Sequence, residues 1–304
     1  MTETAPYRPH RLARSCRLDI RGVSYHVREW GHPNARPLVL LHGARDTSAS
    51  FQFVVDALHG DWYVVAPDWR GHGRTSWTAA SYWQAEFVAD LDALLDELLP
   101  GPAVPLVGHS MGGNIASLYA GARPARVERL IMLDALGDLL HRTPVRVDEI
   151  LQLVLASRHA GASERSYASP SHLAHRLMRA NRRLDPAKAA FLAAAHARLT
   201  GDGRIGWPYD PSFKRSQPTM HCVEDWGAVW RGIAAPVLQV MSSDMRPNAP
   251  ATDPAETARR RSFFRDLTCV TVPATGHNLH HDAPEAVADA IEAFLAAQPL
   301  RRLA

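Results

Sequence analysis

The sequence predicts an α/β fold: a mostly parallel twisted sheet with helices on both faces and a helical segment inserted over it. Three observations support this fold class. Short, continuously apolar runs alternate with segments of helical length in the first half of the chain, the alternation lapses between about residues 137 and 230, and it then resumes. Continuous apolar runs are typical of parallel strands covered on both faces, and alternating strands and helices indicate βαβ units.

Length and composition agree with one large core and one insertion. The chain has 304 residues, of which 46% are hydrophobic, and this is enough for a large α/β core. We therefore predict an N-terminal arm at 1–14, a core at 15–136 and 231–304, and a helical cap at 137–230. The net charge is only +3 and the sequence has no basic stripe, so a nucleic-acid partner is not expected.

The predicted strands and helices follow in chain order. An edge hairpin is expected where apolar and polar residues alternate on both sides of Arg21-Gly22. Further strands are expected from apolar runs at 38–41, 63–66, 103–107, 130–134, 236–241 and 267–272. Helices are expected at 51–58, 81–99, 255–266 and 284–297. The insertion shows helical stripes and no buried-strand pattern.

A serine lies at the turn between the strand at 103–107 and the helix that follows. Gly108, Ser110 and Gly112 form a GxSxG pattern. In such a turn the serine backbone is strained, and the glycines let strand and helix approach without a Cβ clash. The helix start supplies free N–H groups, of which that of Met111 would face a developing oxyanion. Ser110 is therefore the candidate nucleophile, although the pentapeptide alone also occurs in ordinary strand-to-helix turns.

Two further loops accompany this motif. His42-Gly43-Ala44 ends the strand at 38–41, and the segment Asp68-Trp69-Arg70-Gly71-His72-Gly73 follows the strand at 63–66. The glycines of the second loop permit positive φ. We interpret Asp68 and Arg70 as residues that hold this loop in place and not as catalytic residues.

The motif, its place along the chain and the two loops resemble the α/β-hydrolase family, and the resemblance covers nearly the whole chain. It implies a serine hydrolase with a helical cap. It also implies that the backbone N–H of Ala44 is the second oxyanion donor, opposite that of Met111. The family's order of nucleophile, acid and histidine identifies Ser110, Asp244 and His277 as the catalytic triad.

The acid of this triad has a competitor. A serine hydroxyl needs a base within hydrogen-bond reach, and the base needs an acid that orients it. Asp244 and His277 both follow strands, at the ends where α/β sheets place their chemistry. Asp134 lies at the end of an earlier strand and is the alternative acid, because some members of the family use that position.

The resemblance implies hydrolysis of a carboxylic ester, lactone or thioester of a small, largely apolar substrate through an acyl-enzyme on Ser110. A serine at this position argues against haloalkane dehalogenases and the usual epoxide hydrolases, which use a carboxylate. Carbon–carbon bond hydrolysis, acyl transfer by the same triad, and a small-molecule receptor without turnover remain alternatives. No cofactor is expected.

No metal site is expected either, because His172 and His175 have helical i, i+3 spacing but no third ligand nearby. The basic cap and its aromatic residues favour an apolar, anionic acyl substrate, with ordinary core packing as the alternative. The candidate pocket residues are His42, Trp207, Trp226 and His281.

The sequence also carries expectations about location and partners. Its three cysteines are widely spaced, which indicates a reducing compartment and no disulfide framework. The polar first residues lack the apolar stretch of a secretory signal, and no apolar run reaches the ~20 residues of a membrane span. We expect a cytoplasmic monomer or homodimer whose partner is a small-molecule substrate and not a membrane.

Overall fold

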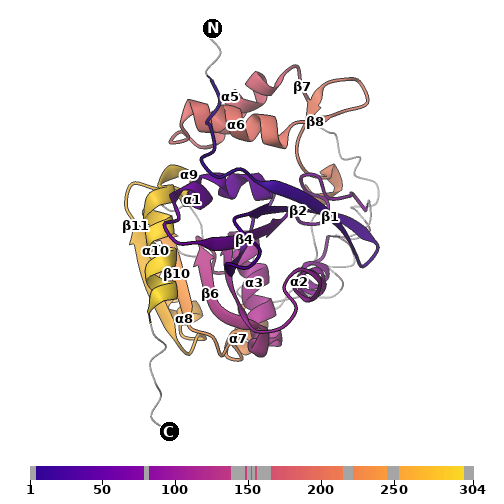
Figure 1. Cartoon of the computed structure of the whole chain (residues 1–304). Coiled ribbons are helices and arrows are strands. Elements are labelled where there is room, and N and C mark those ends of the chain that lie inside the picture. The colour runs from indigo at the N-terminus through magenta and orange to yellow at the C-terminus, as the bar shows by residue number, and fades with distance from the viewer. Residues whose placement is uncertain are drawn as a thin grey trace.

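The computed structural model describes residues 5–78, 82–137, 148, 152, 155, 166–214, 222–244 and 253–297. Its centre is one sheet built from β1 (Arg14–Ile20), β2 (Val23–Trp30), β3 (Arg36–Leu41), β4 (Trp62–Pro67), β5 (Val104–His109), β6 (Val127–Leu133), β10 (Val237–Ser242) and β11 (Leu267–Val272). In space the eight strands have the order β1-β2-β4-β3-β5-β6-β10-β11, and β1 and β11 lie on opposite sides of the molecule in Figure 1.

β1 and β2 form the predicted antiparallel hairpin. Arg21 and Gly22 at its turn have φ values of 52° and 75°, and positive φ at both central residues gives a type I′ turn whose twist matches the strands. β2 and β4 also pair in antiparallel fashion, whereas the remaining neighbouring strands of the sheet are parallel. The prediction of a mostly parallel sheet is therefore confirmed.

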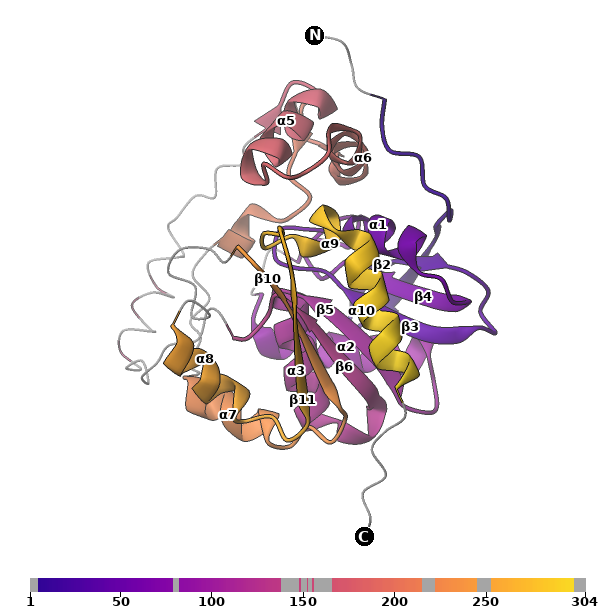
Figure 2. The same ribbon diagram turned by 90° about the vertical axis from the view of Figure 1, so that its left-hand side faces the viewer.

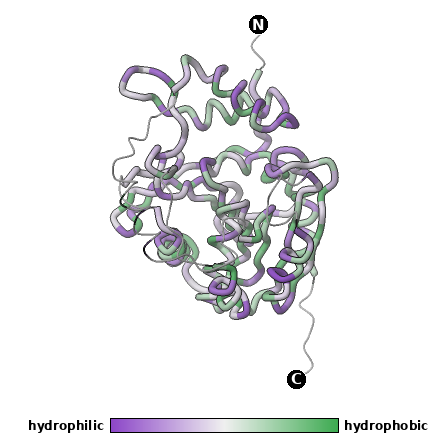
Figure 3. The backbone as a smooth tube through the Cα atoms, turned by 180° about the vertical axis from the view of Figure 1, so that it is seen from behind, coloured by the Kyte–Doolittle hydropathy of each residue, from purple (hydrophilic) through white to green (hydrophobic). Residues whose placement is uncertain are grey.

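Alternate side chains of the central strands enter two different hydrophobic layers, and this explains why their sequences are continuously apolar. In β3, Val39 and Leu41 belong to one layer, and Leu38 and Leu40 belong to the other. The first layer is covered by α2 (Gln84–Leu98), α3 (Met111–Ala122) and α7 (Val223–Trp230), and the second by α1 (Gln52–Ala57) and α10 (Pro284–Ala296) (Figure 2). Hydrophobic segments accordingly lie toward the centre of the molecule (Figure 3).

The predicted helix at 255–266 is shorter in the structure, as α8 (Pro254–Arg261). The chain leaves the helix because Phe263 and Phe264 turn inward. Both are buried, and the ring of Phe264 stacks on Trp230 with 4.9 Å between centroids. Burying two aromatic side chains stabilises the fold more than further turns of a short, arginine-rich helix would.

Between β6 and β10 the chain leaves the sheet and forms a layer over the ends of the strands (Figures 1 and 2). Its described part contains α5 (Pro170–Ala180), α6 (Pro186–His196) and a small sheet of β7 (Ser166–Tyr167), β9 (Ile205–Gly206) and β8 (Arg198–Leu199). These strands depart from the prediction of helices alone, because two-residue strands leave no periodic pattern. Residues 138–165, apart from 148, 152 and 155, lie outside the described residues.

The last part of the predicted cap packs in the core and not over it. Trp226 and Trp230 of α7 are buried in the hydrophobic layer that includes α3. Trp230 Nε1 also donates a hydrogen bond of 2.9 Å to Ser117 Oγ on α3. The chain thus rejoins the core layer at the beginning of α7.

The N-terminal arm connects this upper layer with the core. The backbone N–H of Tyr7 donates to the carbonyl of Ala187 in α6 at 2.9 Å. The hydroxyl of Tyr7 and the backbone N–H of Arg11 donate to the Asp56 carboxylate of α1 at 2.9 and 2.7 Å. Among the described residues, no helix has the length and apolar character needed to cross a membrane.

Candidate active site

Ser110 lies at a sharp turn between β5 and α3 and has φ of 50° and ψ of −116°. Both glycines of the GxSxG pattern are required by close backbone contacts. A Cβ on Gly108 would lie 2.4 Å from the nitrogen of Gly113, and one on Gly112 would lie 2.1 Å from the carbonyl oxygen of Leu41. The sequence prediction of a strained serine between glycines that permit close approach is therefore confirmed.

Ser110, His277 and Asp134 form one hydrogen-bonded line. Ser110 Oγ lies 3.0 Å from His277 Nε2, and His277 Nδ1 lies 2.6 Å from Asp134 Oδ2. An ionised carboxylate can only accept, so Nδ1 carries the proton and Nε2 presents its lone pair to the serine hydroxyl. This is the geometry that a serine needs to become a nucleophile.

Asp134 is held at this position by the neighbouring strand. Its backbone N–H donates to the carbonyl of Val240 at 2.8 Å, and its Oδ1 accepts from the N–H and hydroxyl of Ser242 at 3.1 and 2.9 Å. Burial of Asp134 acts to raise its pKa, but the bonds from His277 and Ser242 outweigh burial and lower the pKa below its usual value. The carboxylate is therefore ionised and oriented.

The prediction that Asp244 contacts His277 is wrong. Asp244 lies beyond the end of β10, its side chain is 57% exposed, and its carboxylate pairs with Arg183 from the layer above the sheet. Its backbone N–H donates to the carbonyl of Thr275 at 3.0 Å. The end of β10 thus supplies Ser242 as a donor to the acid, while the acid itself comes from β6.

The loop of residues 42–46 passes directly beside the nucleophile. A Cβ on Gly43 would lie 3.3 Å from the Cβ of Ser110 and 2.8 Å from Nδ1 of His109. Ala44 follows in an exposed position of this loop, and Met111 begins α3. The two residues predicted as oxyanion donors thus belong to the two segments that meet at Ser110, and their contact with an oxyanion stays a prediction.

His42 does not belong to a substrate pocket. It is fully buried, its Nδ1 donates to the carbonyl of Gly43 at 2.8 Å, and its Nε2 accepts from the N–H of Trp69 at 2.9 Å. Burial lowers the pKa of His42, in agreement with a neutral ring that uses both nitrogens inside the loop. The prediction of His42 as a pocket residue is wrong, and its role is to join the 42–46 loop to the loop after β4.

The interpretation of Asp68 and Arg70 as loop-holding residues is confirmed. Asp68 Oδ1 accepts from the N–H and hydroxyl of Ser48, both at 2.7 Å, and Oδ2 accepts from the N–H of Arg74 at 2.9 Å. Arg70 pairs with the buried Asp90 of α2. These bonds hold the loop after β4 against Ser48, which follows the 42–46 loop, and against α2.

The remaining predicted pocket residues have different surroundings. Trp226 is buried against Trp230, with ring centroids 5.8 Å apart, and the cavity that it helps to line lies between α2, α7 and the C-terminal part of α3. Ser110 is at the other end of α3, so the assignment of Trp226 to a substrate pocket is wrong. Trp207 lies in the upper layer with an edge-to-face contact of 5.6 Å to Tyr167. His281 is buried below that layer and contacts Phe53 edge to face at 5.7 Å. Contact of Trp207 or His281 with a substrate stays a prediction.

Two histidines that were not among the predicted site residues lie beside this line of hydrogen bonds. His109 precedes Ser110, is 3% exposed, and its Nε2 donates to the backbone carbonyl of His277 at 2.8 Å. His280 is fully buried, and its ring lies 4.2 Å from that of His109. Burial, with the nearby His280 and His277, lowers the pKa of His109 well below its usual value. The signal available for His109 was its position inside the serine motif itself.

Known proteins resemble this chain in sequence and in structure. The model of the alpha/beta hydrolase family matches residues 38–290. A serine hydrolase-like protein of Danio rerio is 34% identical over 131 residues, which are 42% of this chain and only 40% of that protein. The 3-hydroxybutyrate-oligomer hydrolase of Cupriavidus necator is 30% identical over 293 residues and is matched over 91% of this chain and 94% of its own length. The thioesterase domain from the curacin biosynthetic pathway has a TM-score of 0.83 and 24% identity, with 93% of this chain and 99% of that chain covered.

Proposed function

The chain belongs to the α/β-hydrolase family and is a hydrolase, and from this premise we propose that it cleaves a carboxylic ester, lactone or thioester through an acyl-enzyme on Ser110. One observation carries the proposal: the line of hydrogen bonds from Ser110 through His277 to Asp134, with Ser110 in a strained turn at the start of a helix. Asp134 takes the place that the sequence assigned to Asp244.

The first half of the proposed reaction forms the acyl-enzyme. Ser110 Oγ attacks the substrate carbonyl while Nε2 of His277 accepts its proton, and the same proton then goes to the leaving alkoxide or thiolate. Asp134 stays ionised and stabilises the imidazolium that exists between these two transfers. The part-buried position of the pair, with side chains 19% and 10% exposed, strengthens this interaction relative to water.

The second half releases the acid. In each half the carbonyl oxygen becomes an oxyanion, which the N–H groups of Met111 and Ala44 would stabilise from opposite sides. Water then attacks the acyl carbon while Nε2 of His277 accepts a proton from it, and His277 returns this proton to Ser110 Oγ as the bond between Oγ and the acyl carbon breaks and the carboxylic acid leaves. None of these reaction steps changes an oxidation state, so none requires an oxidant or a reductant.

An ester is the substrate class with the most support. The Cupriavidus necator relative is named for hydrolysis of 3-hydroxybutyrate oligomers, and oligomers of a hydroxy acid are joined by ester bonds. The Danio rerio relative is named as serine hydrolase-like, which agrees with a serine nucleophile. We therefore place esters before thioesters and lactones as the first substrates to test.

The test combines covalent labelling with turnover. A fluorophosphonate probe should label the wild-type chain at one serine, and Ser110→Ala should abolish labelling and lower kcat on an active ester by ~10⁶. A panel of p-nitrophenyl esters, thioesters and lactones of graded acyl length then ranks the substrate classes. His172→Gln, an exposed change on α5, is the control that should keep full activity.

Two results would contradict the proposal. Labelling and turnover that survive in Ser110→Ala would remove this serine from the reaction. A folded wild-type chain that turns over no member of the panel, yet is stabilised by one of its ligands, would be a receptor.

A further inference from the structure

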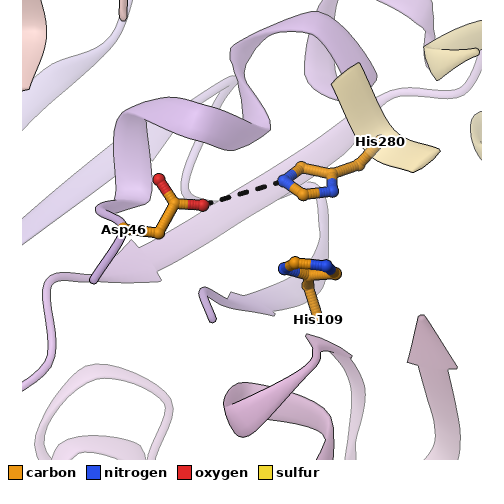
Figure 4. Close-up of side chains that lie close together, drawn as sticks. All are labelled: Asp46, His109 and His280. Carbon is orange, nitrogen blue, oxygen red and sulfur yellow. Dashed lines mark ion pairs between the residues drawn. The ribbon is translucent and has the colours of Figure 1, made fainter. Parts of the chain in front are cut away.

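A second group of polar side chains lies next to Ser110 and His277 but is separate from them. Asp46 comes from the 42–46 loop, His109 from the end of β5, and His280 from α9 (Leu279–Asp282) (Figure 4). Each residue offers one ligand atom, and the three atoms lie within 4.8 Å of one another. We propose that Asp46, His109 and His280 form a binding site for a divalent transition-metal ion, with zinc as the ion that fits best.

The histidine nitrogens at this site lack the hydrogen bonds that buried polar atoms normally make. Within the part of the chain that the structure describes, neither ring nitrogen of His280 has a hydrogen-bond partner, and Nδ1 of His109 has none. Nε2 of His280 faces Asp46 Oδ2 at 3.8 Å, an ion-pair distance (Figure 4) that is too long for a hydrogen bond. Unsatisfied buried nitrogen atoms are costly and require an explanation. A metal ion would satisfy one nitrogen on each ring.

His109 is oriented as metal-binding histidines are. Its Nε2 hydrogen donates to the backbone carbonyl of His277 at 2.8 Å, so Nδ1 carries the lone pair. A hydrogen bond from the second ring nitrogen to a carbonyl is the usual outer partner of a metal-bound histidine. A Cβ on Gly43 would lie 2.8 Å from Nδ1. Because Gly43 has no Cβ, Nδ1 of His109 stays accessible from the 42–46 loop, which also carries Asp46.

Two imidazoles and one carboxylate form a donor set that zinc uses when a coordination position stays open. Zinc bonds of about 2.0–2.2 Å place tetrahedral ligand atoms about 3.3 Å apart. The donors here, at up to 4.8 Å, must therefore approach by about 1.5 Å, which rotation of the side chains can supply. His196 is a further candidate ligand, since its Nε2 lies 3.4 Å from Oδ1 of Asp46.

The position of this site gives it a consequence for catalysis. An ion held by these residues joins the 42–46 loop, the residue before Ser110, and the helix that follows His277. Any part of the approach that side-chain rotation does not supply must come from the 42–46 loop, which would move Ala44 relative to Ser110. We therefore expect bound zinc to lower kcat, a consequence that rests on the proposed hydrolase function.

The binding test does not use hydrolysis. The full-length chain is freed of metal with a chelator and titrated with Zn²⁺ by calorimetry, and Co²⁺ is followed by visible absorption. We expect one Zn²⁺ site whose affinity falls at least about tenfold in Asp46→Asn and in His280→Gln, with no heat from Mg²⁺. The matched control is the double variant His172→Gln/His175→Gln, which removes the two histidines of α5 and should leave the affinity unchanged.

Folding of each variant is checked by circular dichroism, because His280 is fully buried. The cobalt spectrum of the wild-type chain needs no variant: strong absorption shows four-coordinate binding, and the weak spectrum of a six-coordinate ion would overturn the site. Equal Zn²⁺ affinity in the wild type and a folded Asp46→Asn chain would also overturn it. A chain that binds Zn²⁺ as expected but hydrolyses no substrate would contradict only the proposed function.

Discussion

Asp134 and Ser242 connect the ends of two neighbouring parallel strands. One carboxylate oxygen of Asp134 accepts both the backbone N–H and the hydroxyl of Ser242, so only the other oxygen is available to His277. A carboxylate with both oxygens engaged has one orientation. The histidine that depends on it therefore has one orientation too.

The first prediction concerns the residue that orients His277, which is Asp134 in the structure and not Asp244. Asp134→Asn keeps the side-chain volume but favours the wrong imidazole tautomer, and the comparable change in a serine protease lowers kcat by ~10⁴. Asp244→Asn removes a largely exposed pair with Arg183 and should change kcat less than about tenfold. Steady-state kinetics on one active ester compares the two variants, with circular dichroism to show that both are folded. An inactive Asp244→Asn and an active Asp134→Asn would restore the prediction made from the sequence.

The backbone of Ser110 leads to the second prediction. A non-glycine residue at φ of 50° and ψ of −116° carries backbone strain of about 1–3 kcal/mol in the folded state. Glycine relieves this strain, but it loses about 0.5–1 kcal/mol more conformational entropy on folding than alanine does. The relief of strain is the larger of the two effects. Ser110→Gly should therefore unfold at a temperature about 2 °C or more above that of Ser110→Ala, although both variants are inactive. Differential scanning calorimetry measures this difference. A lower melting temperature for the glycine variant would show that the elbow is not strained.

Lowering the pH should remove the contribution that the Asp134 carboxylate makes to the stability of the fold. Burial acts to raise the pKa of Asp134, but His277 and Ser242 outweigh burial, and the folded-state pKa lies below the ordinary value of 3.8. A carboxyl with a depressed pKa stabilises the fold above its unfolded pKa, and this contribution is lost as the pH falls through the folded pKa.

The comparison that isolates this effect is between the wild type and Asp134→Asn. Their difference in unfolding free energy should be largest above pH of about 5 and shrink below pH of about 4. Urea unfolding at a series of pH values measures it. A difference that stays constant over this range would mean that folding does not depress the pKa.

Gly43 leads to a prediction about the oxyanion loop. A Cβ at this position would lie 2.8 Å from the His109 ring and 3.3 Å from the Cβ of Ser110, so in Gly43→Ala the loop or the buried ring must shift, and we expect the loop to move away from Ser110. Displacing one oxyanion donor typically costs 10²–10³ in kcat, and we expect a loss of about this size with little change in KM. Gly201→Ala is the control, since a Cβ there meets nothing within 4 Å and should leave kcat unchanged.

The sequence was sufficient to predict the sheet and two of the three side chains in the hydrogen-bonded line, Ser110 and His277. Ser110 could be predicted because the elbow imposes a local spacing of glycines, and His277 because it follows the last strand of the core. Both signals are short-range. Apolar runs likewise predicted the central strands, since their residues are buried on alternate faces.

The acid could not be decided in this way. Asp134 and Asp244 each follow an apolar strand, and the two strands are neighbours, so their local patterns are alike. What separates them is a pair of contacts distant in sequence: Ser242 bonds to Asp134, and Arg183 draws Asp244 outward. Trp226 was misassigned for the same reason, because only its packing in the layer shared with α3 distinguishes core from pocket.

The chain order of the triad also bears on when activity first exists during synthesis. Ser110 and His277 are 167 residues apart, and Asp134 is translated well before the histidine. β10 follows the insertion in the sequence, so the whole insertion must be synthesised before β10 can pair with β6 and bring Ser242 to Asp134. A nascent chain on the ribosome therefore carries nucleophile and acid without a base. On the proposed mechanism the chain becomes active only after the segment that carries His277 has docked, so loss of that segment should abolish activity and not merely weaken it.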